Sequence, residues 1–392
     1  MTSQYSDLSY LSGAVGRWNQ VISIGDDVRA LSTGMDFREP RYRREVFMRF
    51  YQHHLRWRTH PGCVYFLMPY LADAFAEPWD MERKLWFAFI NGCTQNPVTS
   101  LTIMRNFPYP LLDEEGLQNL DDWFNGHWDV LPFDTDRRYQ KKDFPAAVRA
   151  YHKWLDGRMQ ISAFCNATQK PIDVDPEASF DDLWKMVAKN FVSFGRLSTW
   201  SYLEYLFIAG LPLEPSSMML TDMSGSKSHR NGLTIVLGRD DLDWRKDTAF
   251  QGKYTKEQLA WLESEADNLL KEMRERLGEK DNHQHISRFT LESALCTYKG
   301  WHRPNRRYAN VYSDMLYDRI KQAERLRPNE DFSVFWEARA ACLSPFLRLE
   351  DNPDDPGLQR IKQNHYRLTG QVIMMDEDWA VFRNDNSWRV GR

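Results

Sequence analysis

One short segment, Leu220–Asp243, holds the densest group of side chains suited to chemistry; it reads LTDMSGSKSHRNGLTIVLGRDDLD. Small, hydroxyl-bearing and cationic residues fill positions 224–232. Glycine and serine allow a backbone to approach a ligand closely, and lysine and arginine bind phosphate oxygens. The GxxxxGKS/T spacing of a Walker loop is absent. The segment therefore predicts a phosphate site of another kind, although such a polar run is also typical of a solvated loop.

Two further stretches combine cations with aromatic rings. Residues 37–60 carry seven arginines against two glutamates, and residues 296–327 carry eight lysines and arginines against three acids. Cations interleaved with flat rings suit a phosphate backbone and an unstacked base. Helices whose arginine stems cover aromatic rings give the same pattern, so both interpretations stay open.

Composition limits the class of protein. The chain has 392 residues, of which 42% are hydrophobic, enough for a sizeable core. The net charge of -4 gives no overall basicity, so nucleic-acid binding would depend on local patches. The five cysteines are widely spaced without a CxxC pair, which argues against a disulfide framework and fits a reducing cytoplasm. We recognise no signal peptide and no run of about twenty apolar residues that would span a membrane.

Most of the chain shows helical patterning. Apolar residues recur at threes and fours in several segments that we expect to be helical. These are residues 81–90, 97–104, 144–154, 180–207 with a break at Gly195, 255–277, 290–297 and 309–326. Strands are expected only at Leu233–Leu237 and in a terminal hairpin of Val372–Met375 and Trp379–Phe382.

These elements predict a mostly α fold: a single large helical domain over residues 1–392, with two lobes and a few short strands forming small hairpins. No low-complexity linker divides the chain. The lobes are expected at residues 1–250 and 251–350, and residues 351–392 are expected to form a C-terminal tail or hairpin.

Six blocks, spread in order over about residues 50–325, resemble a known family. They are Pro61–Val64 with Tyr70–Asp73, Met81–Thr94, Asn106–Pro108, Phe194–Leu206, Ser224–Leu242 and Leu291–Tyr308. Together they are similar to the phage α-glutamyl/putrescinyl thymine pyrophosphorylases, which are amino acid:DNA transferases of thymidine hypermodification. Residues 1–50 and those after about 330 carry little of the resemblance.

The resemblance implies a reaction and its partners. Such an enzyme displaces pyrophosphate from 5-pyrophosphoryloxymethyl-uracil in DNA with an amine, from a free amino acid or a polyamine, in the cytoplasm of the infected bacterial host. Three alternatives remain: a helical glycosylase-like, base-flipping enzyme, a non-catalytic DNA-binding scaffold of the modification complex, and a transferase that acts on the free nucleotide before polymerisation. A membrane partner is not expected.

The resemblance also assigns roles to residues. Cations and hydroxyls around the leaving pyrophosphate would stabilise its charge, and a general base would accept the proton of the incoming ammonium. The pyrophosphate ligands are expected to be Ser226, Lys227, Ser228, Arg230, Asn231 and, after Gly195, Arg196. The catalytic candidates are Asp222, Glu204 and His229, whereas Glu82 is better explained as a helix-dipole acid.

A flipped base needs a pocket and the DNA backbone needs cations. The base pocket is assigned to Trp86, Asn91, Thr94 and Gln95, although helix capping also explains the last three. A Cys93 thiolate adding to C6 of uracil is a sharper hypothesis, against the more common inert buried cysteine. The backbone cations are expected to be Lys299, Arg303, Arg306 and Arg307.

No cofactor is compelled by the sequence. No HExxH or comparable ligand spacing and no GxGxxG fingerprint occurs, so no metal-ligating residues are assigned. Asp240, Asp241 and Asp243 are suited to Mg²⁺ beside a pyrophosphate, but helix capping and solvation also account for them.

Replacing Lys299, Arg303, Arg306 and Arg307 by glutamine should weaken DNA binding and flatten its salt dependence. Each phosphate contact contributes about 0.9 to the slope of log K against log salt, so the slope should fall by about 3 to 4. Titrations of duplex DNA at several salt concentrations measure it. An unchanged slope would show that these cations do not contact phosphates.

Overall fold

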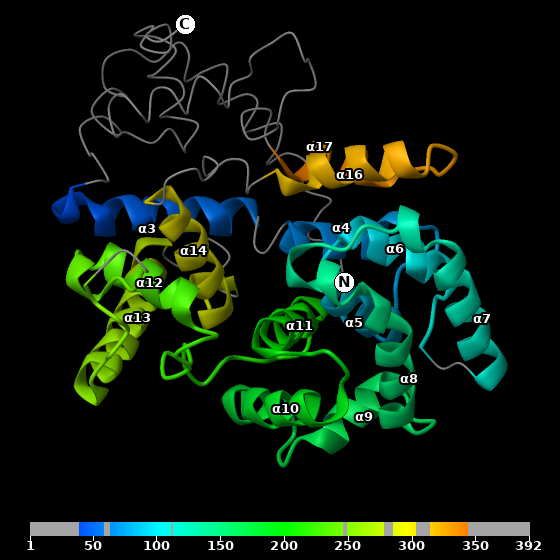
Figure 1. Cartoon of the computed structure of the whole chain (residues 1–392), viewed down its shortest axis with the longest axis horizontal. Coiled ribbons are helices and arrows are strands. Elements are labelled where there is room, and N and C mark those ends of the chain that lie inside the picture. Colours follow the sequence, from blue (N-terminus) through cyan, green and yellow to red (C-terminus); the bar gives the residue numbers. More distant parts are fainter. Residues whose placement is uncertain are drawn as a thin grey trace, which may run out of the picture. The chain divides into compact units, whose positions relative to one another are not determined.

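In a computed structural model of the chain, residues 39–58, 63–110, 113–245, 249–277, 285–302 and 314–343 are described, and every regular element in these ranges is a helix (Figure 1). The expectation of a mostly α fold is therefore confirmed. Among these residues no helix combines the length and the apolar character needed to cross a membrane. The expected terminal hairpin and the cations Arg303, Arg306 and Arg307 lie outside the described residues.

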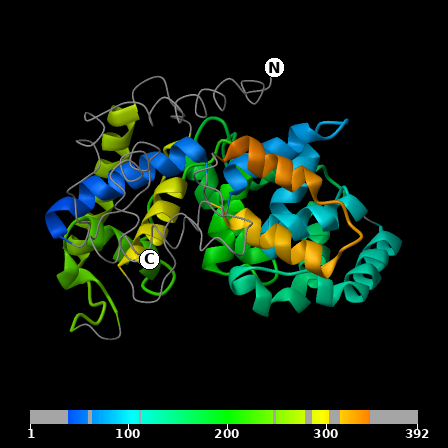
Figure 2. The same ribbon diagram turned by 90° about the horizontal axis from the view of Figure 1, so that it is seen from above.

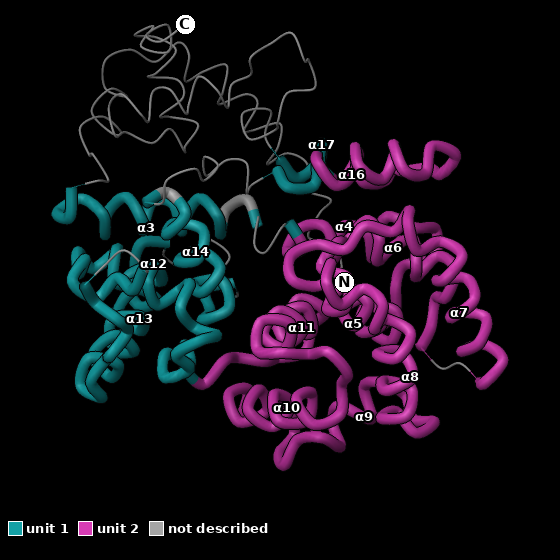
Figure 3. Tube along the Cα trace, viewed as in Figure 1, with its two compact units in different colours: residues 1–63, 217–317, 339–392 teal, residues 64–216, 318–338 magenta. Residues whose placement is uncertain are grey.

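The chain forms two compact units that are interleaved along the sequence (Figure 3). Unit 1 comprises residues 1–63, 217–317 and 339–392, and unit 2 comprises residues 64–216 and 318–338. Each unit is therefore assembled from segments that are far apart in the sequence. The single-domain organisation and the lobes at residues 1–250 and 251–350 stay predictions.

Unit 1 is built on the long helix α3 (Pro40–Trp57), which packs against α12 (Lys227–Val236), α13 (Lys256–Leu277) and α14 (Arg288–Trp301), as Figures 1 and 2 show. The 3-10 helix η5 (Asp240–Leu242) follows α12. Pro40 begins α3, where its missing N–H costs nothing. Two buried tyrosines tie α3 to α14: the Tyr51 hydroxyl lies 2.8 Å from Thr290 Oγ1, and Tyr298 donates to the Arg43 carbonyl at 3.1 Å.

The strand expected at Leu233–Leu237 is wrong, because residues 233–236 are the last turn of α12 and Leu237 is its C-cap. All residues of α12 from His229 to Val236 are buried. A helix buried on every side shows a continuous apolar run instead of amphipathic spacing. Periodicity alone does not separate such a run from a strand.

Unit 2 surrounds a central pair, α5 (Met81–Thr94) and α11 (Arg196–Ala209). The other helices are α4 (Val64–Ala74), α6 (Pro97–Asn106), α7 (Glu114–Gly126), α8 (Phe144–Leu155), α9 (Gln160–Ala167) and α10 (Pro176–Asn190), with 3-10 helices η2 (Trp128–Val130), η3 (Thr135–Tyr139) and η4 (Lys141–Asp143). Most of α16 (Met315–Leu326) and the first part of α17 (Ser333–Cys342) also belong to unit 2.

The helix boundaries of unit 2 largely follow local signals. The Asp80 and Asn96 side chains cap α5 and α6 by accepting the Arg83 and Thr99 amides. Gly195 is the N-cap of α11 and separates it from α10, as the break expected there requires. The helix expected at residues 81–90 is longer in the structure. α5 continues to Thr94 and ends at Gln95, which has the left-handed conformation with φ 50°.

Replacing Gly232 by alanine should destabilise unit 1 by about 1–3 kcal/mol, the usual cost of overpacking. A Cβ atom there would lie 2.3 Å from the Leu295 carbonyl oxygen, and a backbone atom of α14 cannot rotate away. Gly126→Ala is the matched control, because nothing lies within 4 Å of its Cβ position. Urea unfolding curves measure both; equal midpoints would contradict the close crossing of α12 and α14.

Candidate active site

The loop that leads into α12 is shaped by two of the predicted site residues. Asp222 Oδ1 accepts hydrogen bonds from the Gly225 amide at 2.9 Å and from the Ser224 amide and hydroxyl at 3.2 Å. The buried Ser226 hydroxyl donates to the Met219 carbonyl at 2.7 Å. Both side chains therefore fix the turn, as Asp and Ser do when they bond to nearby backbone.

Arg230 is fully buried and holds the same loop from the inside. Its guanidinium donates to the carbonyls of Leu220 at 2.7 Å, Asp222 at 3.1 Å and Met223 at 2.9 Å. The next residue, Asn231, bonds through both amide atoms to the Trp244 backbone, at 2.8 and 3.1 Å. These contacts give Arg230 and Asn231 a role in positioning the loop, and their predicted contact with pyrophosphate stays a prediction.

Two residues in the first turn of α12, Lys227 and Ser228, contact side chains from other segments of unit 1. The half-buried Lys227 holds its ammonium 4.0 Å from the centroid of the Trp244 ring. Lys299, from α14, donates to Ser228 Oγ at 2.5 Å, and its expected contact with the DNA backbone stays a prediction. The N-terminal end of a helix is the positive end of its dipole and exposes amides without intrahelical acceptors. These features suit the turn to a phosphate, and its contact with pyrophosphate stays a prediction.

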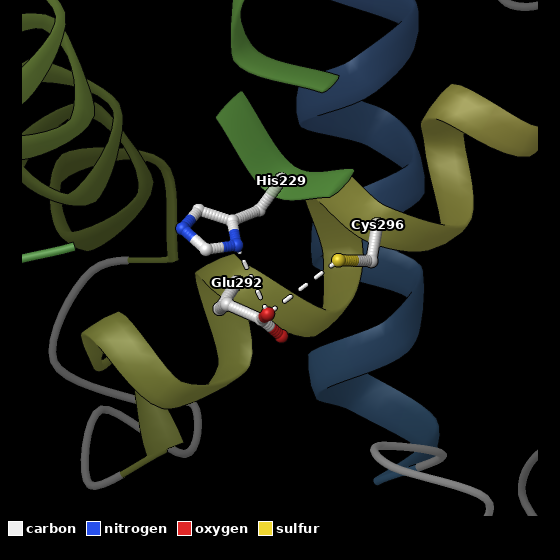
Figure 4. A group of neighbouring side chains, drawn as sticks. All are labelled: His229, Glu292 and Cys296. Carbon is white, nitrogen blue, oxygen red and sulfur yellow. Dashed lines mark hydrogen bonds and ion pairs between the residues drawn. The ribbon is translucent and has the colours of Figure 1, made fainter. Parts of the chain in front are cut away.

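Beside this turn, His229 meets two side chains of α14 (Figure 4). His229 Nδ1 lies 3.0 Å from Glu292 Oε1, and Cys296 Sγ lies 3.5 Å from the same oxygen. His229 Nε2 lies 2.9 Å from the Met218 carbonyl, which only accepts, so Nε2 carries a proton. His229 and Glu292 are buried, which makes this a polar cluster inside unit 1.

The cluster also contains the residues that sequence reasoning missed. Glu292 and Cys296 lie within a block of the family resemblance but received no role. Their spacing with Lys299, at i, i+4 and i+7, places all three on one face of a helix and was the available signal. Burial and the neighbouring Glu292 carboxylate raise the pKa of the Cys296 thiol well above its usual value.

One predicted catalytic residue, Glu204, and one predicted pyrophosphate ligand, Arg196, belong to unit 2. The buried Glu204 carboxylate accepts from the Tyr65 hydroxyl at 2.9 Å. The guanidinium of Arg196 lies 5.2 Å from the centroid of the Trp200 ring, one helical turn along α11. Asp222 and His229 are in unit 1, so the three predicted catalytic residues are divided between the units. Glu82 accepts the backbone amides of Gln160 and Ile161 at 2.8 and 3.1 Å, as a structural acid does.

The predicted base-pocket residues surround the corner between α5 and α6. Thr94 Oγ1 lies 2.7 Å from Ser100 Oγ, which also donates to Asn91 Oδ1 at 3.1 Å. The side-chain amide nitrogens of Asn91 and Gln95 are buried and have no hydrogen-bond partner within the described part of the chain. A buried unpaired donor costs about 1–3 kcal/mol. Such donors suit a ligand that presents carbonyl oxygens.

Trp86 lies in the aromatic core behind this corner. It is fully buried, its ring stacks on Phe89 and Tyr151, and its Nε1 donates to the Phe107 carbonyl at 2.6 Å. The ring supports α5, and its predicted contact with a base stays a prediction. The Cys93 thiol is also buried, and burial raises its pKa to about 12.

The carboxylates proposed for Mg²⁺ face arginines. Asp240 pairs with Arg43 at 2.5 Å, and Asp241 pairs with Arg239 at 2.6 Å. Asp243 Oδ2 lies 3.3 Å from Arg245 Nε. These contacts favour carboxylate–arginine ion pairs around η5 rather than carboxylates that share one cation. The Mg²⁺ assignment stays a prediction.

Three features fit an enzyme that acts on nucleic acid: the helical fold, the first turn of α12, which suits a phosphate, and the side-chain amide donors at the end of α5. The family model described as amino acid:DNA transferase matches residues 67–307. The chain is also similar to the serinyltransferase of Salmonella phage ViI, at 32% identity over 299 residues, which cover 74% of this chain and 71% of that protein. No solved structure matches. The chain belongs to the amino acid:DNA transferase family, and it is a transferase.

Cys93 should resist alkylation in the native protein, whereas Cys165, which is exposed, should react. With a pKa of about 12, only about one Cys93 thiol in 10,000 is ionised at about pH 8, and the thiolate is the nucleophile. Iodoacetamide labelling followed by peptide mass spectrometry compares the two. Equal labelling rates, or loss of transfer in Cys93→Ser, would support the hypothesis that the Cys93 thiolate adds to C6 of uracil.

Proposed function

We propose that this transferase displaces pyrophosphate from 5-pyrophosphoryloxymethyl-uracil in phage DNA with the amine of a free amino acid, in the cytoplasm of the infected host. The family supports DNA and an amino acid as the substrates. Serine is the first amino acid to test, because the relative that covers most of the chain is named a serinyltransferase. A polyamine is the other donor in the proposal.

The bond changes explain which residues the reaction needs. A bond forms between the amine nitrogen and the 5-methylene carbon, and the bond from that carbon to the pyrophosphate oxygen breaks. The leaving pyrophosphate takes the electron pair, so negative charge accumulates on it, and a base accepts the ammonium proton. Cations fixed beside the leaving group lower the barrier most, because their charge is already in place.

The observation that carries the proposal is the contact of Lys299 with Ser228 at the positive end of α12, where Lys227 is the first helical residue. An ammonium and a hydroxyl held at a helix N-terminus support an anion site there. Ser226, Arg230 and Asn231 hold the loop that presents this turn. We assign them to positioning in addition to their predicted contact with pyrophosphate.

Proton transfer and base recognition complete the proposal. Asp222 is the candidate base in unit 1, a half-buried carboxylate five residues before Lys227, the first residue of α12. Glu204 is the candidate in unit 2. The amide donors of Asn91 and Gln95 match the ring carbonyls of a flipped uracil. His229 is held between Met218 and Glu292, which suits it to fix this geometry.

The direct test is a transfer assay. The protein is incubated with DNA that contains 5-pyrophosphoryloxymethyl-uracil and single amino acids or putrescine, and the digested nucleosides are weighed by mass spectrometry. A nucleoside that has gained one amino acid and lost both phosphates supports the proposal. Release of a free base would identify a glycosylase, and unchanged nucleosides with bound DNA would identify a scaffold.

With serine, one further assay is needed, because serine offers two nucleophiles, its amine and its hydroxyl. Attachment through nitrogen leaves a secondary amine, whereas attachment through the hydroxyl leaves a primary amine of the same mass. A reagent specific for primary amines separates the two products. If the reagent labels the product, the attacking group is the serine hydroxyl and not the amine.

Lys227→Gln should lower kcat for transfer by about 100-fold, the usual effect of removing one donor to a developing anion. Lys271→Gln is the matched control: it removes the same charge from the exposed face of α13 in the same unit. Steady-state rates with the activated DNA measure both. Equal rates for the two variants would remove Lys227 from the site.

A further inference from the structure

We propose that His229, Glu292 and Cys296 bind one divalent zinc-class ion between α12 and α14. Their ligand atoms, Nδ1, a carboxylate oxygen and Sγ, all lie within 4.8 Å of one another. Figure 4 shows the three side chains converging from the two helices. Zinc takes ligands at about 2.0–2.3 Å, which places its ligand atoms roughly 3–4 Å apart, so small movements close the site.

The hydrogen bond on the far side of the imidazole selects the atom that faces the ion. Nε2 donates to the Met218 carbonyl at 2.9 Å, so in the neutral ring Nδ1 carries the lone pair. That lone pair faces Glu292 Oε1 at 3.0 Å. Two acceptors at this distance repel each other unless a proton or a cation lies between them. Histidines that bind metals commonly donate their other N–H to a backbone carbonyl in this way.

The donor set indicates the class of metal. Nitrogen, carboxylate oxygen and thiolate sulfur together are the ligands of zinc, whereas magnesium and calcium require oxygen. Binding of the ion would release the proton of the Cys296 thiol to solvent. Glu292 and Cys296 are separated by four residues on α14, so one helix supplies a chelating pair in a fixed register. His229 completes the set from α12, whose close approach at Gly232 fixes the distance between the helices.

Three protein ligands are the number found in catalytic zinc sites, which leave a fourth position for water or substrate. Ser228 and Lys299 lie beside the cluster, at the turn assigned to pyrophosphate. Any part the ion takes in transfer rests on the proposed function. Binding of the ion does not rest on it, because metal binding is measured on the protein alone, without DNA or an amino acid.

The test uses the full chain without a histidine tag. After dialysis against metal-free buffer, elemental analysis should find about one zinc per chain. Replacing zinc by cobalt should produce a sulfur-to-cobalt charge-transfer band. Cys296→Ser should abolish the band and weaken binding by about 100-fold or more. Cys165→Ser, which changes an exposed cysteine of α9, is the matched control and should keep both.

Two results would overturn the proposal: zinc content no higher than in His229→Asn, or a charge-transfer band that survives Cys296→Ser. The first would mean that a shared proton joins His229 and Glu292. If Cys296→Ser does not fold, X-ray absorption of the zinc-loaded wild-type protein decides instead. One sulfur at about 2.3 Å with nitrogen and oxygen at about 2.0–2.2 Å supports the site, and a shell without sulfur refutes it.

Discussion

The close crossing of α12 and α14 is the constraint on which the candidate site depends. Gly232 allows the two backbones to meet where any side chain would strike the Leu295 carbonyl. That approach brings His229 within 3.0 Å of Glu292 and Ser228 within hydrogen-bonding distance of Lys299. The polar cluster is therefore a product of backbone packing, and its geometry is only as fixed as that packing.

Each unit also holds a polar segment by means of a fully buried arginine. In unit 1, Arg230 donates to three carbonyls of the loop before α12. In unit 2, Arg137 donates to the Cys93 carbonyl at the end of α5 and to the Ser193 carbonyl before α11. A guanidinium has five donors in a rigid plane, so it satisfies several carbonyls at once. Arg230, whose residue type also suits a phosphate ligand, therefore braces its loop from the inside.

This bracing explains why the site was only partly predictable. Helices such as α5, α8 and α13 follow from apolar spacing and caps, which are local properties. The prediction of an anion site in residues 224–232 also follows from their residue types. Arg230 and Lys227 look alike in the sequence, yet one is buried among carbonyls and the other lies half-exposed beside Trp244. Burial depends on neighbours that are distant in the chain.

The sequence by itself determined the helical class of the fold and the membership of the family, because periodicity, residue type and order along the chain carry this information. Only the tertiary structure decided that Leu233 and its neighbours are helical and that His229 meets Glu292 and Cys296. The reason is physical: these ligands come from helices separated by more than fifty residues. No local spacing motif records such a contact, which exists only once α12 and α14 have packed.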